Sequence, residues 1–268
     1  MGYFARRRRR RRFIIAGILF FAAIVTFITP SIMKMANKAH MDSIVYDFEE
    51  TAQEMREDGS YKDALENGEI DDEGYPIDEE GNRTDDKPVV YKYDVDRLYK
   101  DSLAYNTEVV AGQHLSEWQF TQPALNLGDY GIWNGVYAYV TIPALGLDVP
   151  IYLGATNYNM SIGVTHLGGT SLPIGGETSN CVIAGHNGYT GRTFFDYISE
   201  LNVGDSVSVT NYFYTLEYEV IESKQILSTD VSGVYLAPHK DRLTLLTCAD
   251  RGRERWQVTC ERKNQSNS

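Results

Sequence analysis

The feature that most constrains this chain is a run of seven arginines, Arg6 to Arg12, followed directly by the uncharged apolar stretch Phe13 to Thr29. These seventeen residues are at the short end of the length with which a helix spans a bilayer, and Ser31 to Met33 lengthen the stretch to residues 13–33. A basic run can also mark a nucleic-acid patch, but a run that abuts an apolar stretch is more typical of a membrane segment.

Because arginines stay on the cytoplasmic side of a membrane, residues 1–12 are predicted to be a cytoplasmic tail. Residues 13–33 are then a transmembrane anchor, and the chain beyond about residue 34 is extracellular, so the protein is expected to be a single-pass membrane protein. No small-residue cleavage site follows the stretch directly, which makes a cleaved signal peptide the lesser alternative.

The chain of 268 residues has room for one folded domain with accessory segments. Within residues 34–88, apolar side chains recur at helical spacing from Ala39 to Arg56 and predict an amphipathic helix. An acidic linker follows and contributes to the net charge of −12. Clustered carboxylates can bind calcium, but Asp71-Asp72-Glu73-Gly74 lacks the spacing of an EF-hand loop, so we expect a solvated spacer.

Residues 89–135 contain a second predicted helix, from Asp94 to Tyr105, with Asp94 as its N-cap. The rest of this segment has no clear period but carries four aromatic residues: Trp118, Phe120, Tyr130 and Trp133. Because these side chains need a surface to pack on, the segment is expected to lie across the following domain, and one hypothesis is that it forms a lid.

From residue 136 to residue 263 the chain changes to short strands with turns between them, rich in β-branched and aromatic residues. Strands are predicted at 136–142, 149–153, 181–186, 206–210, 212–221, 224–227 and 243–248 and from residue 255, with helical insertions at 157–162 and 194–201. This pattern indicates a mainly β domain, a barrel or a sandwich, without an internal repeat. A polar tail, 264–268, follows.

The strand Leu243 to Cys248 ends in a cysteine, and a polar turn then leads to a strand that opens with Arg255. A thiol beside a guanidinium is a plausible nucleophile with its charge partner. The strand from Cys181 ends in His186, which is the best candidate for the base. Cys248, His186 and Arg255 are therefore the predicted catalytic residues.

Each of these residues has rivals. The chain contains four other histidines, none of which ends an apolar strand next to glycine: His40, His114, His166 and His239. Arg253 competes with Arg255, which is preferred because Arg-Trp-Gln-Val resembles the start of a strand. Cys181 and Cys260 could form a disulfide, although two small buried side chains are the simpler interpretation.

These motifs resemble those of the sortases, the cysteine transpeptidases of Gram-positive cell surfaces. Thr244-Leu245-Leu246-Thr247-Cys248 is similar to the family's T-L-x-T-C signature, Ala184-Gly185-His186 to its histidine motif, and residues 163–176 to pilus-assembling class C members. The resemblance covers about residues 136–262. It implies an eight-stranded β-barrel without cofactor or metal, with Cys248, His186 and Arg255 in catalysis.

The resemblance also implies the reaction: cleavage of an LPXTG-like sorting signal between Thr and Gly, and transfer of the acyl group to an amine. The expected partners are sorting-signal proteins or pilins, with a pilin lysine as acceptor in pilus assembly. The alternative acceptor is a peptidoglycan cross-bridge, in wall anchoring.

The sequence departs from class C in several places. Asn187 follows the histidine, as in some class B members, and Ala249-Asp250 replaces the usual Thr-Pro-Tyr. The aromatic lid motif and the C-terminal membrane helix of many class C enzymes are absent. Two other functions are less favoured: another cysteine enzyme of the wall, whose nucleophile motif would differ, and a non-catalytic β-barrel module.

Overall fold

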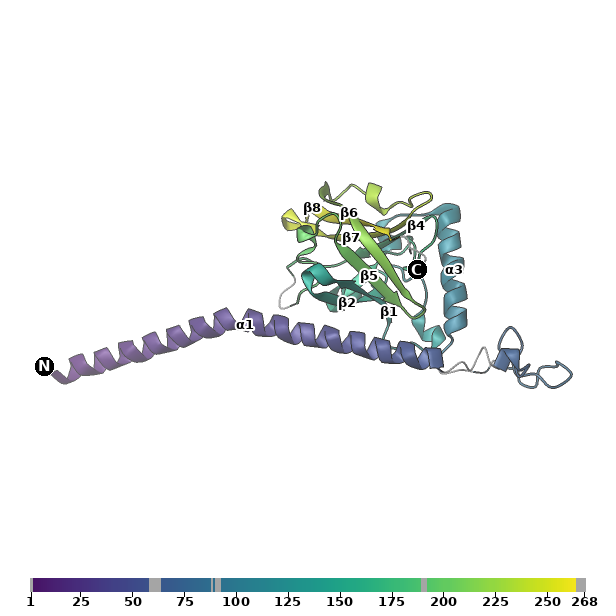
Figure 1. The fold of residues 1–268 in the computed structure, drawn as a ribbon. Coiled ribbons are helices and arrows are strands. Elements are labelled where there is room, and N and C mark those ends of the chain that lie inside the picture. The colour runs from purple at the N-terminus through teal and green to yellow at the C-terminus, as the bar shows by residue number, and fades with distance from the viewer. Residues whose placement is uncertain (1, 58–63, 88, 90–92, 189–191, 264–268) are drawn as a thin grey trace.

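The computed structural model describes residues 2–57, 64–87, 89, 93–188 and 192–263. Within these residues eight strands form a closed barrel in the order β1-β2-β3-β4-β7-β8-β6-β5 (Figure 1). The predicted mainly β fold is confirmed, and it is a barrel, not a sandwich. The strands are β1 (Val136–Ile142), β2 (Leu147–Leu153), β3 (Val164–His166), β4 (Ser179–Ala184), β5 (Ser206–Asn211), β6 (Thr215–Leu227), β7 (Asp241–Ala249) and β8 (Glu254–Arg262).

Alternating side chains explain how these strands close around one core. In β5, Val207 and Val209 are buried while the serines beside them are partly exposed, which is the pattern of a strand with one face toward the interior. The two strands predicted at 212–221 and 224–227 are one strand, β6, interrupted by a shift of register between Val220 and Glu222. The three residues of β3 were not predicted, because so short a strand has no measurable period.

Helix α1 (Gly2–Glu57) joins the apolar stretch to the barrel without a break. The sequence predicted two segments, an anchor and a helix at 39–56, but they are continuous. Pro30 lies inside α1, where it removes a backbone hydrogen bond and favours a bend, and Figure 1 shows that the helix is not straight. Tertiary packing keeps the second half helical, since Met41, Phe48, Ala52 and Met55 are buried in the core.

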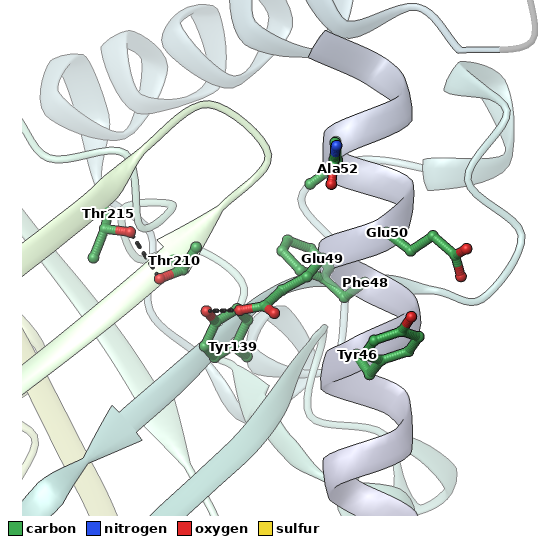
Figure 2. Close-up of a pocket in the computed structure, with 9 residues that line it drawn as sticks. Tyr46, Phe48, Glu49, Glu50, Ala52, Tyr139, Thr210 and Thr215 are labelled. Carbon is green, nitrogen blue, oxygen red and sulfur yellow. Dashed lines mark hydrogen bonds between the residues drawn. The ribbon is translucent and has the colours of Figure 1, made fainter. Parts of the chain in front are cut away.

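The second half of α1 covers the outside of β1 and β2. The Phe48 ring packs on Tyr139 and Tyr212, with centroid distances of 5.6 and 4.4 Å. Glu49 accepts a 2.7 Å hydrogen bond from the Tyr139 hydroxyl, beside a pocket of about 500 Å³ that also contacts Thr210 and Thr215 (Figure 2). This half of the helix is therefore part of the folded domain.

Helix α3 (Val95–Gly112) begins as predicted, with the Asp94 carboxylate accepting from the Arg97 N–H, but it continues beyond Tyr105. Its Ser102 hydroxyl lies 2.8 Å from that of Tyr137, and its Asn106 accepts from the Leu172 N–H at 2.7 Å. These contacts place α3 at the barrel end where β4 and β7 begin. Because Leu98 is buried in the core, α3 is part of the fold and not a removable cover.

The four aromatic residues of this segment have different environments. Tyr130 is buried in the core, and Phe120, at the end of the short helix α4 (Glu117–Phe120), packs against a cluster of Leu167, Val182 and Val234. Trp118 and Trp133 are exposed. The expectation that the segment packs across the domain is therefore correct for two of the four.

Two smaller segments complete the chain. Helix α5 (Asn157–Ile162) has the predicted bounds, whereas the helix predicted at 194–201 is a single 3-10 turn, η3 (Ile198–Glu200). The predicted tail, 264–268, lies outside the described residues.

The acidic segment 64–87 contains two similar turns that the sequence did not reveal. Asp71 accepts from the N–H groups of Glu73 and Tyr75, and Asp78 accepts in the same way from Glu80 and Asn82. An Asp-x-Glu-Gly motif stands at each of the two turns, at residues 71–74 and 78–81. Because this segment has no hydrophobic period, the sequence predicted it only as an acidic linker without these turns.

Candidate active site

Cys248 lies one residue before the end of β7, on the outer face of the barrel. Leu243 and Leu245 are fully buried in the core, and side chains alternate along a strand, so Thr244, Leu246 and Cys248 face outward. The thiol is only partly buried. It is therefore accessible from the surface, as a nucleophile must be.

Arg255 is the direct cross-strand neighbour of Cys248, because β7 and β8 are antiparallel and pair these two residues. Opposite residues in such a pair have Cα atoms about 4.5–5.5 Å apart, with side chains on the same face. The guanidinium Nη1 donates to the carbonyl oxygens of Gly252 and Glu254 at 2.9 and 3.0 Å. The β7–β8 turn thus holds this permanent positive charge on the face of the thiol.

His186 follows β4, which runs parallel to β7 on its other side. The two segments stay in contact beyond the last strand pair. The Gly185 N–H donates to the Leu246 carbonyl at 3.0 Å, and the Thr247 hydroxyl donates to the Gly185 carbonyl at 2.8 Å. The Asn187 side-chain amide then donates to the Cys248 carbonyl at 2.9 Å. His186 is therefore held beside Cys248, on the side away from Arg255.

The surroundings of His186 act on its pKa in opposite directions. Partial burial, the larger effect, lowers the pKa below its usual 6.5, and the nearby Asp196 carboxylate raises it. Asp196 also accepts from the N–H groups of Gly188 and Phe194, both at 3.0 Å, across the loop that follows the histidine. Asp196 thus links Gly188 to Phe194, and its charge favours the imidazolium against the effect of burial.

Close packing explains why a glycine, Gly185, precedes His186. Gly185 faces the core, where an added Cβ would lie 2.8 Å from both Phe195 and Val164. Such distances are too short for carbon contacts. The Ala-Gly-His motif therefore brings the backbone close to Phe195 and holds the histidine at the barrel rim.

The rival residues lie in other settings. Arg253 is 76% exposed and pairs with Asp250 at 2.6 Å, so the strand register favours Arg255. His166 is fully buried, His239 pairs with Glu177 on the surface, and His40 and His114 are exposed. None of these four histidines belongs to the residues that pair with the end of β7.

The other two cysteines are free and buried. Cys181 and Cys260 pair with Leu243 from opposite sides, so two strand spacings, about 10 Å, separate them. That distance is too long for a disulfide. Burial raises the pKa of both thiols, that of Cys260 to about 12, which suits the interpretation that they are small core residues.

The outer face of the same strands carries an apolar floor and a cleft. Val182 and the partly buried Ala184 and Leu246 belong to the cluster that Phe120 contacts. Beside them, a cleft of about 430 Å³ lies under the β6–β7 loop, with Gly233, Tyr235, Thr244 and Gln257 among its lining residues. An extended peptide laid along β7 would have its chain on this face and one end at Cys248.

Sequence reasoning named the three central residues but missed Asp196, Asn187 and the outer face. Asp196 lies in a segment predicted as helix, and its contacts depend on the loop conformation. Asn187 appeared only as a departure from a motif. The row of Thr244, Leu246 and Cys248 could have been found from the alternation that placed Leu243 and Leu245 together.

Comparisons with known proteins agree with this geometry. A family model described as a sortase domain matches residues 140–263, which include nearly the whole barrel. Among curated proteins, sortase D of Bacillus subtilis is 28% identical over 107 residues, 40% of this chain and 51% of that protein. The chain spans about half the length of the curated relatives it matches.

Solved structures extend the comparison beyond the barrel. Sortase C-1 of Actinomyces oris is 29% identical, with a TM-score of 0.58 over 64% of this chain and 100% of that one. Sortase C-1 of Streptococcus pneumoniae is 30% identical, with a TM-score of 0.56 over 63% of this chain and 89% of that one. Since the barrel, the family model and these structures agree, the chain belongs to the sortase family.

Proposed function

We propose that this protein is a membrane-anchored cysteine transpeptidase. It would cleave an LPXTG-like sorting signal between Thr and Gly and join the acyl product to an amine, with a pilin lysine as the acceptor. The observation that carries the proposal is the strand register around the end of β7, which pairs Cys248 with Arg255 and extends β4 to His186 on the other side.

In the first half of the reaction, the Cys248 thiolate attacks the threonine carbonyl carbon of the signal. His186, in its imidazolium form, gives its proton to the leaving glycine amine; burial lowers the pKa of this imidazole, and Asp196 opposes that effect. Arg255, with the backbone N–H of Ala249, stabilises the negative charge that develops on the carbonyl oxygen. A thioester of Cys248 and a free glycine amine result.

In the second half, the acceptor amine attacks the thioester carbon, His186 takes up the proton of the amine, and Cys248 leaves as thiolate. The signal would lie along the outer face of β7. In an extended peptide, Leu lies three residues and about 10 Å before Thr, which places it over the apolar floor of Val182, Ala184 and Leu246.

The pilin lysine is favoured over a wall cross-bridge because the similar solved structures are sortases C. One of them, from group B Streptococcus, is described as pilus-related. The first half of α1 supports the anchor. Residues 13–33 are apolar and exposed, and 21 helical residues extend about 31 Å, close to the hydrocarbon thickness of a bilayer.

The test uses the soluble chain from residue 37, which keeps the part of α1 that packs on the barrel, and a panel of sorting-signal peptides. Mass spectrometry should detect an acyl adduct on Cys248 that transfers to a lysine-bearing pilin fragment. Cys248→Ala should form no adduct and keep its fold, while Cys260→Ala, which removes a thiol far from the rim, should still be acylated.

Two outcomes would change the proposal. Transfer to a cross-bridge peptide and not to the pilin fragment would make the protein a wall-anchoring enzyme. Peptide cleavage by a folded Cys248→Ala variant would exclude the thioester mechanism altogether.

A further inference from the structure

Helix α1 meets the barrel directly where its apolar stretch ends. Lys34 is the first charged residue after that stretch. Its ammonium lies 3.5 Å from the Tyr197 hydroxyl and 5.8 Å above the centre of that ring. One turn later, Lys38 donates to the Gly146 carbonyl at 3.3 Å. The barrel therefore begins within a turn or two of the apolar segment.

These contacts involve the end of the barrel that carries the thiol. Gly146 lies between β1 and β2, and Tyr197 follows the His186 loop, whereas Glu49 contacts Tyr139 further along the helix. The β7–β8 turn lies at the end of the barrel nearer the N-terminal half of α1 (Figure 1). If the apolar stretch crosses a bilayer, the Cys248 end of the barrel faces that bilayer.

A pocket of about 270 Å³ lies at this junction, between α1 and the barrel. Met35, Met41, Leu145, Leu147 and Val149 give it apolar walls, and Lys34, Lys38 and Tyr197 add polar groups. Its acidic residue, Asp148, accepts a 2.6 Å hydrogen bond from Thr141, and Lys38 pairs with Asp42 at 3.5 Å. Among the described residues, no carboxylate forms an ion pair with Lys34.

An apolar pocket with a lysine and a tyrosine, at the point where a helix leaves a membrane, has the chemistry of a lipid site. Lysine and tyrosine side chains typically place their polar ends in the headgroup layer and their apolar parts below it. The acidic turns of residues 64–87 lie beyond the opposite end of α1 (Figure 1), where they do not repel an anionic headgroup near Lys34.

We propose that this pocket binds an anionic phospholipid, with the phosphate on Lys34 and the acyl chain against Met35 and Leu145. The bound lipid holds the Cys248 end of the barrel on the headgroup layer. The proposal rests on the membrane anchor proposed above. It predicts that the enzyme acts on donors and acceptors held at the membrane surface.

The test places the full chain, with Cys248→Ala, in phosphatidylcholine nanodiscs and attaches a bimane fluorophore to one new cysteine. Ser199→Cys puts the label next to Tyr197, and Glu177→Cys puts it on the exposed loop before β4, at the far end. Cys181 and Cys260 are buried and do not compete. A minor fraction of lipid brominated in its acyl chains serves as the quencher, either phosphatidylglycerol or phosphatidylcholine.

The expected result is quenching at residue 199 and none at residue 177, with phosphatidylglycerol the stronger quencher. Lys34→Glu should lose this preference, by about fivefold for one lysine at an anionic surface, whereas Lys100→Glu on α3 should keep it. Equal quenching by the two lipids would exclude the site, and no quenching at residue 199 would exclude the orientation.

A second copy of the chain is the competing occupant. It would change the fluorescence at residue 199 with protein concentration in detergent, without lipid, and that result would overturn the lipid proposal. The proposed catalytic function is tested separately, because acylation of the soluble chain by a peptide involves neither Lys34 nor a bilayer. Failure of one proposal can therefore be told from failure of the other.

Discussion

Arg253 and Arg255 lie only two positions apart, but Arg255 is the one placed to assist the Cys248 thiol. Arg255 pairs across the strands with Cys248, while Arg253 pairs with Asp250 on the surface. Arg255→Ala should therefore lower kcat for peptide cleavage by about 100- to 1,000-fold, the usual loss when a group that stabilises an oxyanion is removed. Steady-state kinetics of the soluble chain measure this.

Arg253→Ala is the matched control and should leave kcat within a few-fold of the parent. It removes the same side chain two positions earlier, before β8 begins, where no residue pairs with Cys248. If kcat fell strongly in Arg253→Ala and was unchanged in Arg255→Ala, the catalytic role would belong to Arg253.

His166, in strand β3, is a buried histidine whose pKa is strongly lowered in the folded protein. Its Nε2 lies 3.1 Å from the carbonyl oxygens of Thr170 and Ser171, to which it donates, and its Nδ1 is buried. Burial lowers its pKa from 6.5 to about 4. The folded protein therefore keeps this side chain neutral at pH values where the unfolded chain is already protonated.

The sign of the effect on stability follows from this difference. Between pH 6.5 and 4 the unfolded state binds the proton more tightly, so the free energy of unfolding falls as the pH falls. The loss is on the order of 3 kcal/mol, from 1.36 kcal/mol per pKa unit. Denaturant unfolding at several pH values should show a weaker pH dependence in His166→Gln, while His239→Gln, on the surface, should keep the parent's dependence.

At the scale of elements, Asp196, in the segment between β4 and β5, raises the pKa of His186 against the effect of burial. Asp196→Asn keeps one of the two oxygens that accept from the Gly188 and Phe194 N–H groups, and it removes the charge that raises the pKa of His186. The basic limb of the pH profile of kcat/KM should therefore move to lower pH. An unchanged basic limb, with normal folding, would remove Asp196 from the proposed site.

Helix α1 belongs to the domain through a few buried side chains, and this can be tested without a membrane. Phe48 is fully buried against Tyr139 and Tyr212, whereas Tyr46 on the same helix is 65% exposed. In the chain from residue 37, Phe48→Ala should lower the free energy of unfolding by about 3–5 kcal/mol. Tyr46→Ala should change it by no more than about 0.5 kcal/mol, and similar losses in both would show that the helix is not docked.

For the molecule as a whole, the sequence predicted the strands better than their arrangement. Alternation located most strands, and the resemblance to sortases supplied the barrel. Pairing between distant strands, such as β4 with β7, leaves no local pattern. The continuity of α1 was missed because Pro30 normally marks a helix boundary, whereas here it lies inside the helix.

For the candidate site too, the sequence predicted some residues and missed others. Cys248, His186 and Arg255 stand in recognisable motifs at strand ends, so local sequence named them. The contacts of Asp196, Asn187 and Gly185 join segments that meet only in the folded barrel. The lid hypothesis treated residues 89–135 as one unit, but α3 supports the far end of the barrel while Leu115 and Phe120 pack near the apolar floor.

The parallel pairing of β4 with β7 also determines when the protein becomes active. Parallel neighbours cannot be joined by a tight turn, and the long chain between His186 and Cys248 must be ordered before the two meet. β7 and β8 follow every other strand in the sequence. If the chain is exported behind the N-terminal anchor proposed above, His186 emerges well before Cys248. On the proposed mechanism, the newly made protein therefore stays inactive until its last two strands have crossed the membrane and joined the barrel.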